Sequence, residues 1–235
     1  MQNLALNIAE KGFNISVYNR SGDKTDAAVS RAQKEGLGDH LHGYKDLKEF
    51  VQSLHRPRRV ILLVKAGAPV DATIAGLSEY MEPGDIIIDG GNEWYENTER
   101  RQAALKEKGI VEIGMGVSGG EEGARRGMQT FLYTGAICMP VISSSFFSFS
   151  SSFSLFYKKK HMCAGPAMMP GGDAEAYKYL QPIVEKVAAQ TEDGACVTYI
   201  GPGGSGTCAT YSLMCYALEL TQLLCLFRLS LQGTL

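Results

Sequence analysis

Several features that would mark a class of protein are missing from this 235-residue sequence. Its six cysteines form no C-x-x-C pair and all lie in the C-terminal half, so we expect neither a metal site nor a disulfide framework. Basic and acidic residues nearly balance at 23 and 25, which argues against a nucleic-acid partner. Residues 1–12 have no basic segment and no apolar core, so they do not resemble a signal peptide. These absences predict a chain in a reducing compartment, the cytoplasm.

Charge is missing from one long segment. No charged residue occurs between Gly127 and Tyr157, and residues 143–154 consist of eight serines and four phenylalanines. Such a segment is long enough to span a membrane, but its hydroxyl groups and Pro140 argue against a membrane association. Serine and phenylalanine share pyrimidine-rich codons, which points instead to a retained intron or a faulty gene model. We therefore predict a low-complexity insertion at 128–168, with residues 128–160 irregular or poorly packed.

Outside that segment, apolar runs alternate with helical patterns. Strands are predicted at 13–18, 59–64, 85–89 and 109–114, and helices at 2–11, 25–35, 47–54, 70–81 and 96–108. Nearly continuous apolar strands, each followed by a helix, are typical of a parallel sheet covered on both faces. The sequence therefore predicts an α/β fold, a Rossmann-like doubly wound parallel sheet whose ligands bind beyond the carboxyl ends of its strands.

The glycine-rich turn that opens the first helix of such folds is missing. No G-x-G-x-x-G turn precedes the predicted helix 2–11, and no strand precedes it either. We therefore expect an incomplete sheet over residues 13–127, with its first strand missing. The lost strand pairing would cost a free energy comparable to the net stability of a domain, ~5–15 kcal/mol.

Asn19, Arg20 and Ser21 follow the predicted strand 13–18. A dinucleotide-binding fold reaches the adenosine ribose at this point, where an acidic residue accepts the 2′-hydroxyl of NAD and an Arg accommodates the 2′-phosphate of NADP. Because Arg20 is present and a carboxylate is not, the sequence predicts NADP as the cofactor. The alternative interpretation is an exposed loop arginine without a ligand.

Small residues follow three further strands. The turn 64–67 lets a cofactor approach the backbone, or is an ordinary loop. In the turn 89–92, two glycines release the backbone and Asn92 offers a donor and an acceptor, although Asn in a tight turn is often only conformational. The segment 118–120, Ser-Gly-Gly, presents backbone N–H groups and a hydroxyl, which suit a carboxylate or hydroxyl group of a ligand.

Four motifs together resemble the 6-phosphogluconate dehydrogenase family, the NADP-linked decarboxylating enzymes of the pentose phosphate pathway. They are Asn-Arg-Ser at 19–21, Leu-Val-Lys-Ala-Gly at 63–67, Ile-Ile-Ile-Asp-Gly-Gly-Asn at 86–92 and Gly-Val-Ser-Gly-Gly-Glu-Glu-Gly-Ala-Arg at 116–125. The resemblance covers residues 2–127 and resumes over 169–206, so we predict one NADP-binding domain built from 1–127 and 169–206. It implies NADP contacts from Asn19, Arg20, Ser21, Val64, Lys65, Ala66 and Asn92, and 6-phosphogluconate contacts from Asn92, Ser118, Gly119 and Gly120.

The sequence departs from this family at the chemistry. Thr210 stands where the family has a Lys general base, and Leu213 and Met214 stand where it has a His-Asn pair for the substrate. No lysine follows Lys186, so no catalytic residue is predicted. Residues 207–235 are interpreted as a divergent apolar tail. We expect the all-helical domain that completes the family's substrate site and homodimer to be absent.

Three functions remain open at this point. By resemblance the activity is oxidative decarboxylation of 6-phosphogluconate to ribulose 5-phosphate with NADP, in a chain that is itself inactive. The alternative is a non-catalytic NADP-binding fragment, or the product of a faulty gene model. A related short-chain hydroxyacid dehydrogenase is a third possibility, which the motif at 116–125 disfavours.

Overall fold

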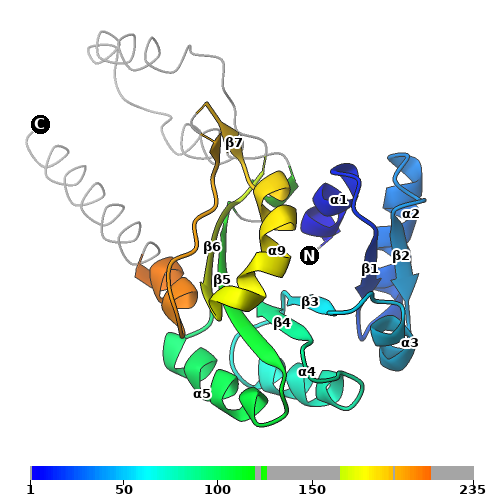
Figure 1. Ribbon diagram of the computed structural model, residues 1–235. Coiled ribbons are helices and arrows are strands. Elements are labelled where there is room, and N and C mark those ends of the chain that lie inside the picture. Colours follow the sequence, from blue (N-terminus) through cyan, green and yellow to red (C-terminus); the bar gives the residue numbers. More distant parts are fainter. Residues whose placement is uncertain (1, 120–122, 126–164, 193, 213–235) are drawn as a thin grey trace, which may run out of the picture. The chain divides into compact units, whose positions relative to one another are not determined.

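The computed structural model describes residues 2–119, 123–125, 165–192 and 194–212, which form two compact units (Figure 1). The described residues of the first unit are 2–46, 118–119, 123–125, 165–168, 182–192 and 194–197. Those of the second unit are 47–117, 169–181 and 198–212. The predicted insertion at 128–168 lies outside the described residues except for its last four, and the tail 207–235 lies outside them beyond residue 212.

Helices and strands alternate along most of the described chain. The helices are α1 (Gln2–Glu10), α2 (Gly22–Lys34), α3 (Leu47–Gln52), α4 (Ala68–Ser78), α5 (Tyr95–Lys106) and α9 (Ala174–Val187). The strands are β1 (Ile15–Tyr18), β2 (Leu41–Tyr44), β3 (Arg59–Leu62), β4 (Ile86–Asp89), β5 (Val111–Ser118), β6 (Ala167–Gly172), β7 (Gln190–Thr191) and β8 (Gly194–Ala195). The strands and helices predicted between residues 2 and 114 all occur, with boundaries shifted by a few residues.

The first unit is built on the parallel pair β1–β2, in which Ile15 lies opposite Leu41. Helices α1 and α2 both contact these two strands (Figure 1). Apolar side chains from both helices and from β2 form the core, with Leu6 and Ala32 fully buried. Helix α1 ends where the sequence predicts, because Gly12 takes the positive φ of 83° that favours glycine after a helix.

Strand β2 is the one element between residues 2 and 118 that the sequence did not predict, and no prediction was made for β6, α9, β7 and β8. The β2 sequence Leu-His-Gly-Tyr is short and contains glycine, which weakens any strand signal. Packing explains the strand: a Cβ at Gly43 would lie 2.8 Å from the Thr25 side chain of α2. Gly43 therefore lets α2 pack closely on β2. The tertiary contact, rather than local propensity, determines this strand.

The second unit is built on a four-stranded sheet in the order β3-β4-β5-β6. The pairs β3–β4 and β4–β5 are parallel, with Leu62 opposite Asp89 and Asp89 opposite Gly114. The isoleucines of β4 are almost fully buried, as expected for an inner strand. Strand β6 is last in this order, and on its other side isolated parallel bridges join Met168 to Val197 and Gly171 to Gly201.

A glycine-rich contact joins the C-terminal described residues to this sheet. Residues 205–212 are helical, and Gly206 lies so close to the carbonyl oxygens of Gly114 and Met169 that a Cβ there would overlap both. Gly171 of β6 lies equally close to Gly206. The glycines at 203–206 thus allow helix 205–212 to pack directly on β5 and β6.

The prediction of a Rossmann-like fold with parallel strands is confirmed, but the strands are divided between separate sheets. Among the described residues no ladder connects β1 or β2 to β3. In a doubly wound sheet the strand that precedes the first helix joins these two halves, and the described residues begin with α1. Within the described part of the chain, no helix combines the length and apolar character needed to cross a membrane.

Candidate functional site

Two loops meet at the carboxyl edge of the β3–β4 pair. Because these strands are parallel, the loop 63–67 after β3 and the turn 90–92 after β4 leave the sheet on the same side. Gly90 donates its N–H to Leu62 O at 2.9 Å, and a Cβ at Gly90 would lie 2.9 Å from the Leu63 side chain. A Cβ at Gly91 would lie 3.2 Å from Val64 O. The Gly-Gly pair is therefore required by the close approach of the two loops.

Glu93 follows this turn and accepts four hydrogen bonds. Its Oε2 accepts from the Gly67 N–H and from Arg101 Nη1, each at 2.8 Å. Its Oε1 accepts from its neighbour Trp94 N at 2.9 Å and from Asn97 Nδ2 at 3.1 Å. Burial alone would raise the pKa of Glu93, but the bonds from Gly67 and Arg101 outweigh it and lower the pKa to about 2. The carboxylate is therefore charged and fully occupied.

Arg101 of α5 connects Glu93 to helix α4. Its Nε donates to Asp71 Oδ1 at 2.8 Å, and its Nη2 donates to Gly67 O at 3.2 Å. The Arg101 side chain is 3% exposed. The hydrogen bond from Arg101 lowers the pKa of Asp71, which Arg100 also contacts from the surface at 2.9 Å. Arg101 thus joins α4, α5 and the loop 63–67.

Two further carboxylates lie in this unit with unpartnered oxygens. Asp89 is fully buried; its Oδ1 accepts from Gly91 N at 2.9 Å, whereas its Oδ2 has no hydrogen-bond partner and lies 3.6 Å from Arg101 Nη1. Glu112 of β5 is 2% exposed, and neither of its carboxylate oxygens has a partner. Burial and the nearby charge of Asp89 raise the pKa of Glu112 to about 8. Glu112 is therefore a buried acid that is protonated at neutral pH.

The residues predicted to contact ligand differ sharply from these buried groups. Lys65 and Asn92 are exposed, and within the described ranges neither side chain has a hydrogen-bond or ion-pair partner. Val64 and Ala66 are half-buried beside Lys65. The second unit thus brings the loop 64–66 and the turn of Asn92 together, and among the described residues the side chains of Lys65 and Asn92 have unused polar groups.

The first unit carries Asn19, Arg20 and Ser21 between β1 and α2. Asn19 Oδ1 accepts from Ser21 N at 2.9 Å, a local turn that Asn favours. Arg20 is exposed and has no hydrogen-bond or ion-pair partner in the part of the chain that the structure describes. Ser21 is the N-cap residue of α2, but its hydroxyl makes no capping hydrogen bond. Both side chains are therefore available to bind an anion.

Two of the predicted substrate residues, Ser118 and Gly119, lie at the end of β5. Ser118 is exposed as the last residue of the strand, and Gly119 adopts a φ of 121° that side-chain-bearing residues rarely take. Gly120 lies outside the described residues. The geometry of the predicted Ser-Gly-Gly cradle is therefore described only for its first two members.

Thr210 lies within helix 205–212 and is 6% exposed. Its Oγ1 donates to Gly206 O at 3.1 Å, one helical turn earlier. A Cβ at Gly116 of β5 would overlap this oxygen, so Thr210 packs directly on the strand. Leu213 and Met214 lie outside the described residues. The hydroxyl of Thr210 is thus committed to the backbone of its own helix.

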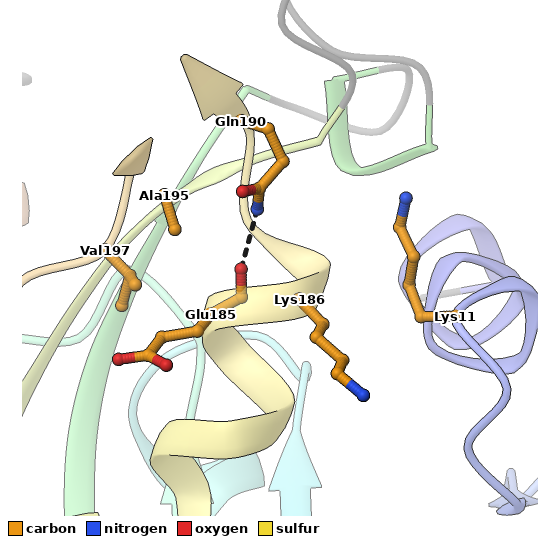
Figure 2. Close-up of a pocket in the computed structure, with 6 residues that line it drawn as sticks. All are labelled: Lys11, Glu185, Lys186, Gln190, Ala195 and Val197. Atoms are coloured by element: carbon orange, nitrogen blue, oxygen red, sulfur yellow. Dashed lines mark hydrogen bonds between the residues drawn. The ribbon is translucent and has the colours of Figure 1, made fainter. Parts of the chain in front are cut away.

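One open pocket of about 660 Å³ lies elsewhere, within the first unit (Figure 2). Its lining residues are Lys11, Glu185, Lys186, Gln190, Ala195 and Val197. Gln190 Nε2 donates to Glu185 O at 2.7 Å, and Lys186 Nζ lies 5.2 Å from the centroid of the Phe13 ring. None of the predicted ligand residues lines this pocket, so it is not the candidate site.

Comparison with known proteins identifies the family. A sequence profile described as the NAD binding domain of 6-phosphogluconate dehydrogenase matches residues 2–138, more than half of the chain. The chain belongs to the 6-phosphogluconate dehydrogenase family. The match confirms the family resemblance predicted from the four motifs. It also confirms that the Rossmann-like domain is of the type that binds a nicotinamide dinucleotide.

Individual members of the 6-phosphogluconate dehydrogenase family are highly similar to this chain. It is 54% identical over 205 residues to 6-phosphogluconate dehydrogenase, decarboxylating 1, of Spinacia oleracea, covering 87% of this chain and 34% of that protein. The decarboxylating 3, chloroplastic, protein of Arabidopsis thaliana is 53% identical, with the same coverage. A solved structure of Plasmodium falciparum 6-phosphogluconate dehydrogenase, described with its cofactor NADP⁺ and its substrate 6-phosphogluconate, is 43% identical. It has a TM-score of 0.68 and covers 88% of this chain and 36% of that chain. The chain thus spans about a third of the length of these relatives.

The sequence reasoning missed Glu93 and Arg101. The helix 96–108 was predicted only as a charged helix, in which arginines usually face solvent. The one available signal was position in the sequence. Glu93 directly follows the Asp-Gly-Gly-Asn turn, and Arg101 comes eight residues after Glu93, about two helical turns. Such spacing places the arginine on the same side of α5 as the turn.

Proposed function

We propose that this chain is an NADP-binding domain that selects NADP over NAD through Arg20. The observation that carries the proposal is the exposed Arg20 guanidinium, which has no partner among the described residues and lies beside the free Ser21 hydroxyl. Guanidinium groups bind phosphate through short, charge-assisted hydrogen bonds. No carboxylate occupies positions 19–21 to accept a ribose 2′-hydroxyl.

The residues present fit a 2′-phosphate. Ser21 precedes the 13-residue helix α2, whose first-turn N–H groups and dipole favour an anion. Asp23 lies in the first turn of α2 and opposes the anion, so the positive charge of Arg20 is needed to offset it. The family resemblance implies further cofactor contacts from Lys65 and Asn92 of the second unit, whose side chains have no hydrogen-bond or ion-pair partner among the described residues.

A calorimetric titration of the full chain with NADP and with NAD tests this proposal. We expect tighter binding of NADP, and Arg20→Ala should weaken NADP binding about tenfold or more while leaving NAD binding unchanged. Lys34→Ala is the matched control, since it removes one exposed positive charge from the opposite end of α2. Equal affinities of the unmodified chain for NADP and NAD would contradict the proposal.

We further propose 6-phosphogluconate as the substrate of the family activity, with contacts from Asn92, Ser118, Gly119 and Gly120. In that reaction NADP accepts a hydride from C3 of the sugar acid, and a base accepts the proton of the C3 hydroxyl. The resulting 3-keto acid then loses carbon dioxide, and a proton added to the carbon that carried the carboxylate gives ribulose 5-phosphate. The family relationship supports this substrate, and the exposed positions of Asn92 and Ser118 are compatible with it.

We propose that the chain as given does not carry out this turnover. Thr210 stands at the position of the family's lysine base, and its buried hydroxyl already donates to Gly206 O. A hydroxyl lacks the tunable pKa of an amine, and general acid–base catalysis contributes ~10²–10⁴-fold.

We propose the cytoplasm as the compartment of this chain; one relative from Arabidopsis thaliana is named as chloroplastic.

Measuring NADPH formation with NADP and 6-phosphogluconate tests the absence of turnover. We expect none above background, and Thr210→Lys alone should not restore it, because Leu213 and Met214 replace the His-Asn pair. Steady NADPH formation by the unmodified chain that Asn92→Ala or Ser118→Ala abolishes would overturn this proposal.

A further inference from the structure

We propose that Glu93 is a positioning residue for the dinucleotide, which fixes the loop 63–67 and the turn of Asn92 in one arrangement. The inference rests on the proposed NADP site. It assigns a role to a residue outside the four sequence motifs, and it is carried by the contacts of Glu93 with Gly67 and Arg101. Arg101 also forms a hydrogen bond with Gly67, and we call the side chains of Glu93 and Arg101 together the Gly67 clamp.

The Gly67 clamp binds both polar backbone groups of Gly67. The Gly67 N–H donates to Glu93 Oε2 at 2.8 Å, and Arg101 Nη2 donates to Gly67 O at 3.2 Å. Gly67 itself has a φ of 89° and begins helix α4 as its N-cap residue. Glycine reaches this conformation without steric cost but does not prefer it over others. The two charged side chains therefore select one backbone conformation at the end of the loop.

The Gly67 clamp depends on Glu93 being an ionised carboxylate. Both carboxylate oxygens act as acceptors, Oε2 for the Gly67 N–H and Arg101 Nη1 and Oε1 for Trp94 N and Asn97 Nδ2. A glutamine in the same position has only one acceptor oxygen, so it loses two of these four bonds. The carboxylate is 3% exposed, where hydrogen bonds to charged groups are stronger than in water. Since the bonded partners lower the pKa of Glu93 to about 2, the clamp stays charged at neutral pH.

Glu93 is buried, whereas the neighbouring residues proposed to contact the ligand are exposed. Its side chain is almost completely buried, so it does not reach a bound ligand. Asn92 precedes it in the chain, and Lys65 lies two residues before Gly67; both of these side chains are exposed. Glu93 thus holds the two segments that carry the free polar groups without contributing one of its own.

The test compares Glu93→Gln with Glu96→Gln in the full chain. Glu96 is an exposed acid in the first turn of α5, so its substitution removes the same charge without touching the clamp. For Glu93→Gln we expect NADP affinity to fall about tenfold, and 2′,5′-ADP, which offers the 2′-phosphate to Arg20, to bind as before. Amide hydrogen exchange in peptides covering 63–67 should become faster, while exchange in β4 stays unchanged. Glu96→Gln should change none of these quantities.

Three outcomes would overturn the inference, and they are distinguishable. If the unmodified chain binds NADP and Glu93→Gln binds it equally well, the positioning role is wrong and the proposed function stands. If the unmodified chain does not bind NADP, the proposed function fails, and the role of Glu93 toward a dinucleotide fails with it. Equal loss of NADP and 2′,5′-ADP affinity in Glu93→Gln would indicate general unfolding and would also contradict the inference; thermal unfolding of the same samples checks this directly.

Discussion

Two arginines of this chain, Arg20 and Arg101, show opposite uses of the same side chain. Arg20 follows β1 in the first unit, is exposed and has no partner in the described part of the chain. Arg101 lies on α5 in the second unit, is 3% exposed and contacts Asp71, Glu93 and Gly67. A guanidinium has five N–H donors, and Arg101 uses its donors within the protein whereas Arg20 leaves all of them free.

The difference separates polar groups that are bonded within the protein from polar groups that have unused donors. The buried charges of the second unit shape the loops after β3 and β4, and a ligand cannot reach them. The exposed groups at Arg20, Lys65 and Asn92 have spare donors and lie at the ends of strands, where doubly wound folds bind ligands. Substitution at a buried group should therefore change stability first, and substitution at an exposed group should change binding alone.

The largest effect is expected at Arg101. Arg101→Met keeps the apolar stem of the side chain but leaves Glu93 and Asp89 buried near no positive charge. Removing one partner of a buried ion pair costs ~3–5 kcal/mol, so the free energy of unfolding in urea should fall by about that amount. Arg100→Met, which breaks only the exposed pair with Asp71, should cost at most ~1 kcal/mol. Similar losses for both variants would contradict the distinction between buried and exposed charges.

The second effect is a pH dependence that Glu112 confers. Its pKa is about 8 in the folded chain against 4.5 for the unperturbed group, so the folded chain binds one more proton between these values. The free energy of unfolding should therefore fall as pH rises through this window, by a total on the order of a few kcal/mol. Asp89, whose pKa burial also raises, contributes with the same sign, while the charge of Arg101 opposes the shift of Glu112.

Urea unfolding at several pH values between 5 and 8 tests this dependence. Glu112→Gln should remove most of the slope and be more stable than the unmodified chain at the alkaline end. Glu107→Gln, at an exposed position of the same unit, should leave the slope unchanged. Parallel profiles for Glu112→Gln and the unmodified chain would show that Glu112 does not carry the linkage.

A smaller effect is expected where Thr210 packs on β5. Gly116→Ala places a methyl group on Thr210 Oγ1, so helix 205–212 must shift, at a cost of ~1–3 kcal/mol in unfolding free energy. Adding Thr210→Ala should recover part of the loss, because it removes the overlapping oxygen. Gly123→Ala is the control, since within the described ranges no atom outside its own helix and chain neighbours lies within 4 Å of a Cβ there. An unchanged midpoint for Gly116→Ala would contradict the close packing of Thr210.

Much of the fold could be predicted because its strands are almost purely apolar. The Ile-Ile-Ile run of β4 is typical of an inner strand, and glycine after α1 marks the helix end. Strand β2 could not be predicted, since its Gly43 reflects the packing of α2 and weakens the local signal. The missing first strand predicts an incomplete sheet, but how the remaining strands pair into separate sheets depends on long-range contacts that no local pattern records.

The candidate site was predictable only in its exposed part. Arg20 and Asn92 stand out in the sequence because each lies shortly after a predicted strand, where doubly wound folds bind their ligands. Glu93 and Arg101 look like ordinary surface charges in the sequence, and only the folded contacts show that they bind Gly67. Likewise the buried, unpartnered Glu112 departs from the apolar pattern of its strand without any local signal for its raised pKa.

The central claim, that Arg20 is kept free for a 2′-phosphate, is tested most directly by measuring NADP affinity and unfolding free energy on the same Arg20→Ala sample. The account predicts an NADP affinity about tenfold or more below that of the unmodified chain. It also predicts an unfolding free energy within ~0.5 kcal/mol of the unmodified chain, as for other exposed side chains. An unchanged affinity, or a loss of stability as large as that expected for Arg101→Met, would contradict it.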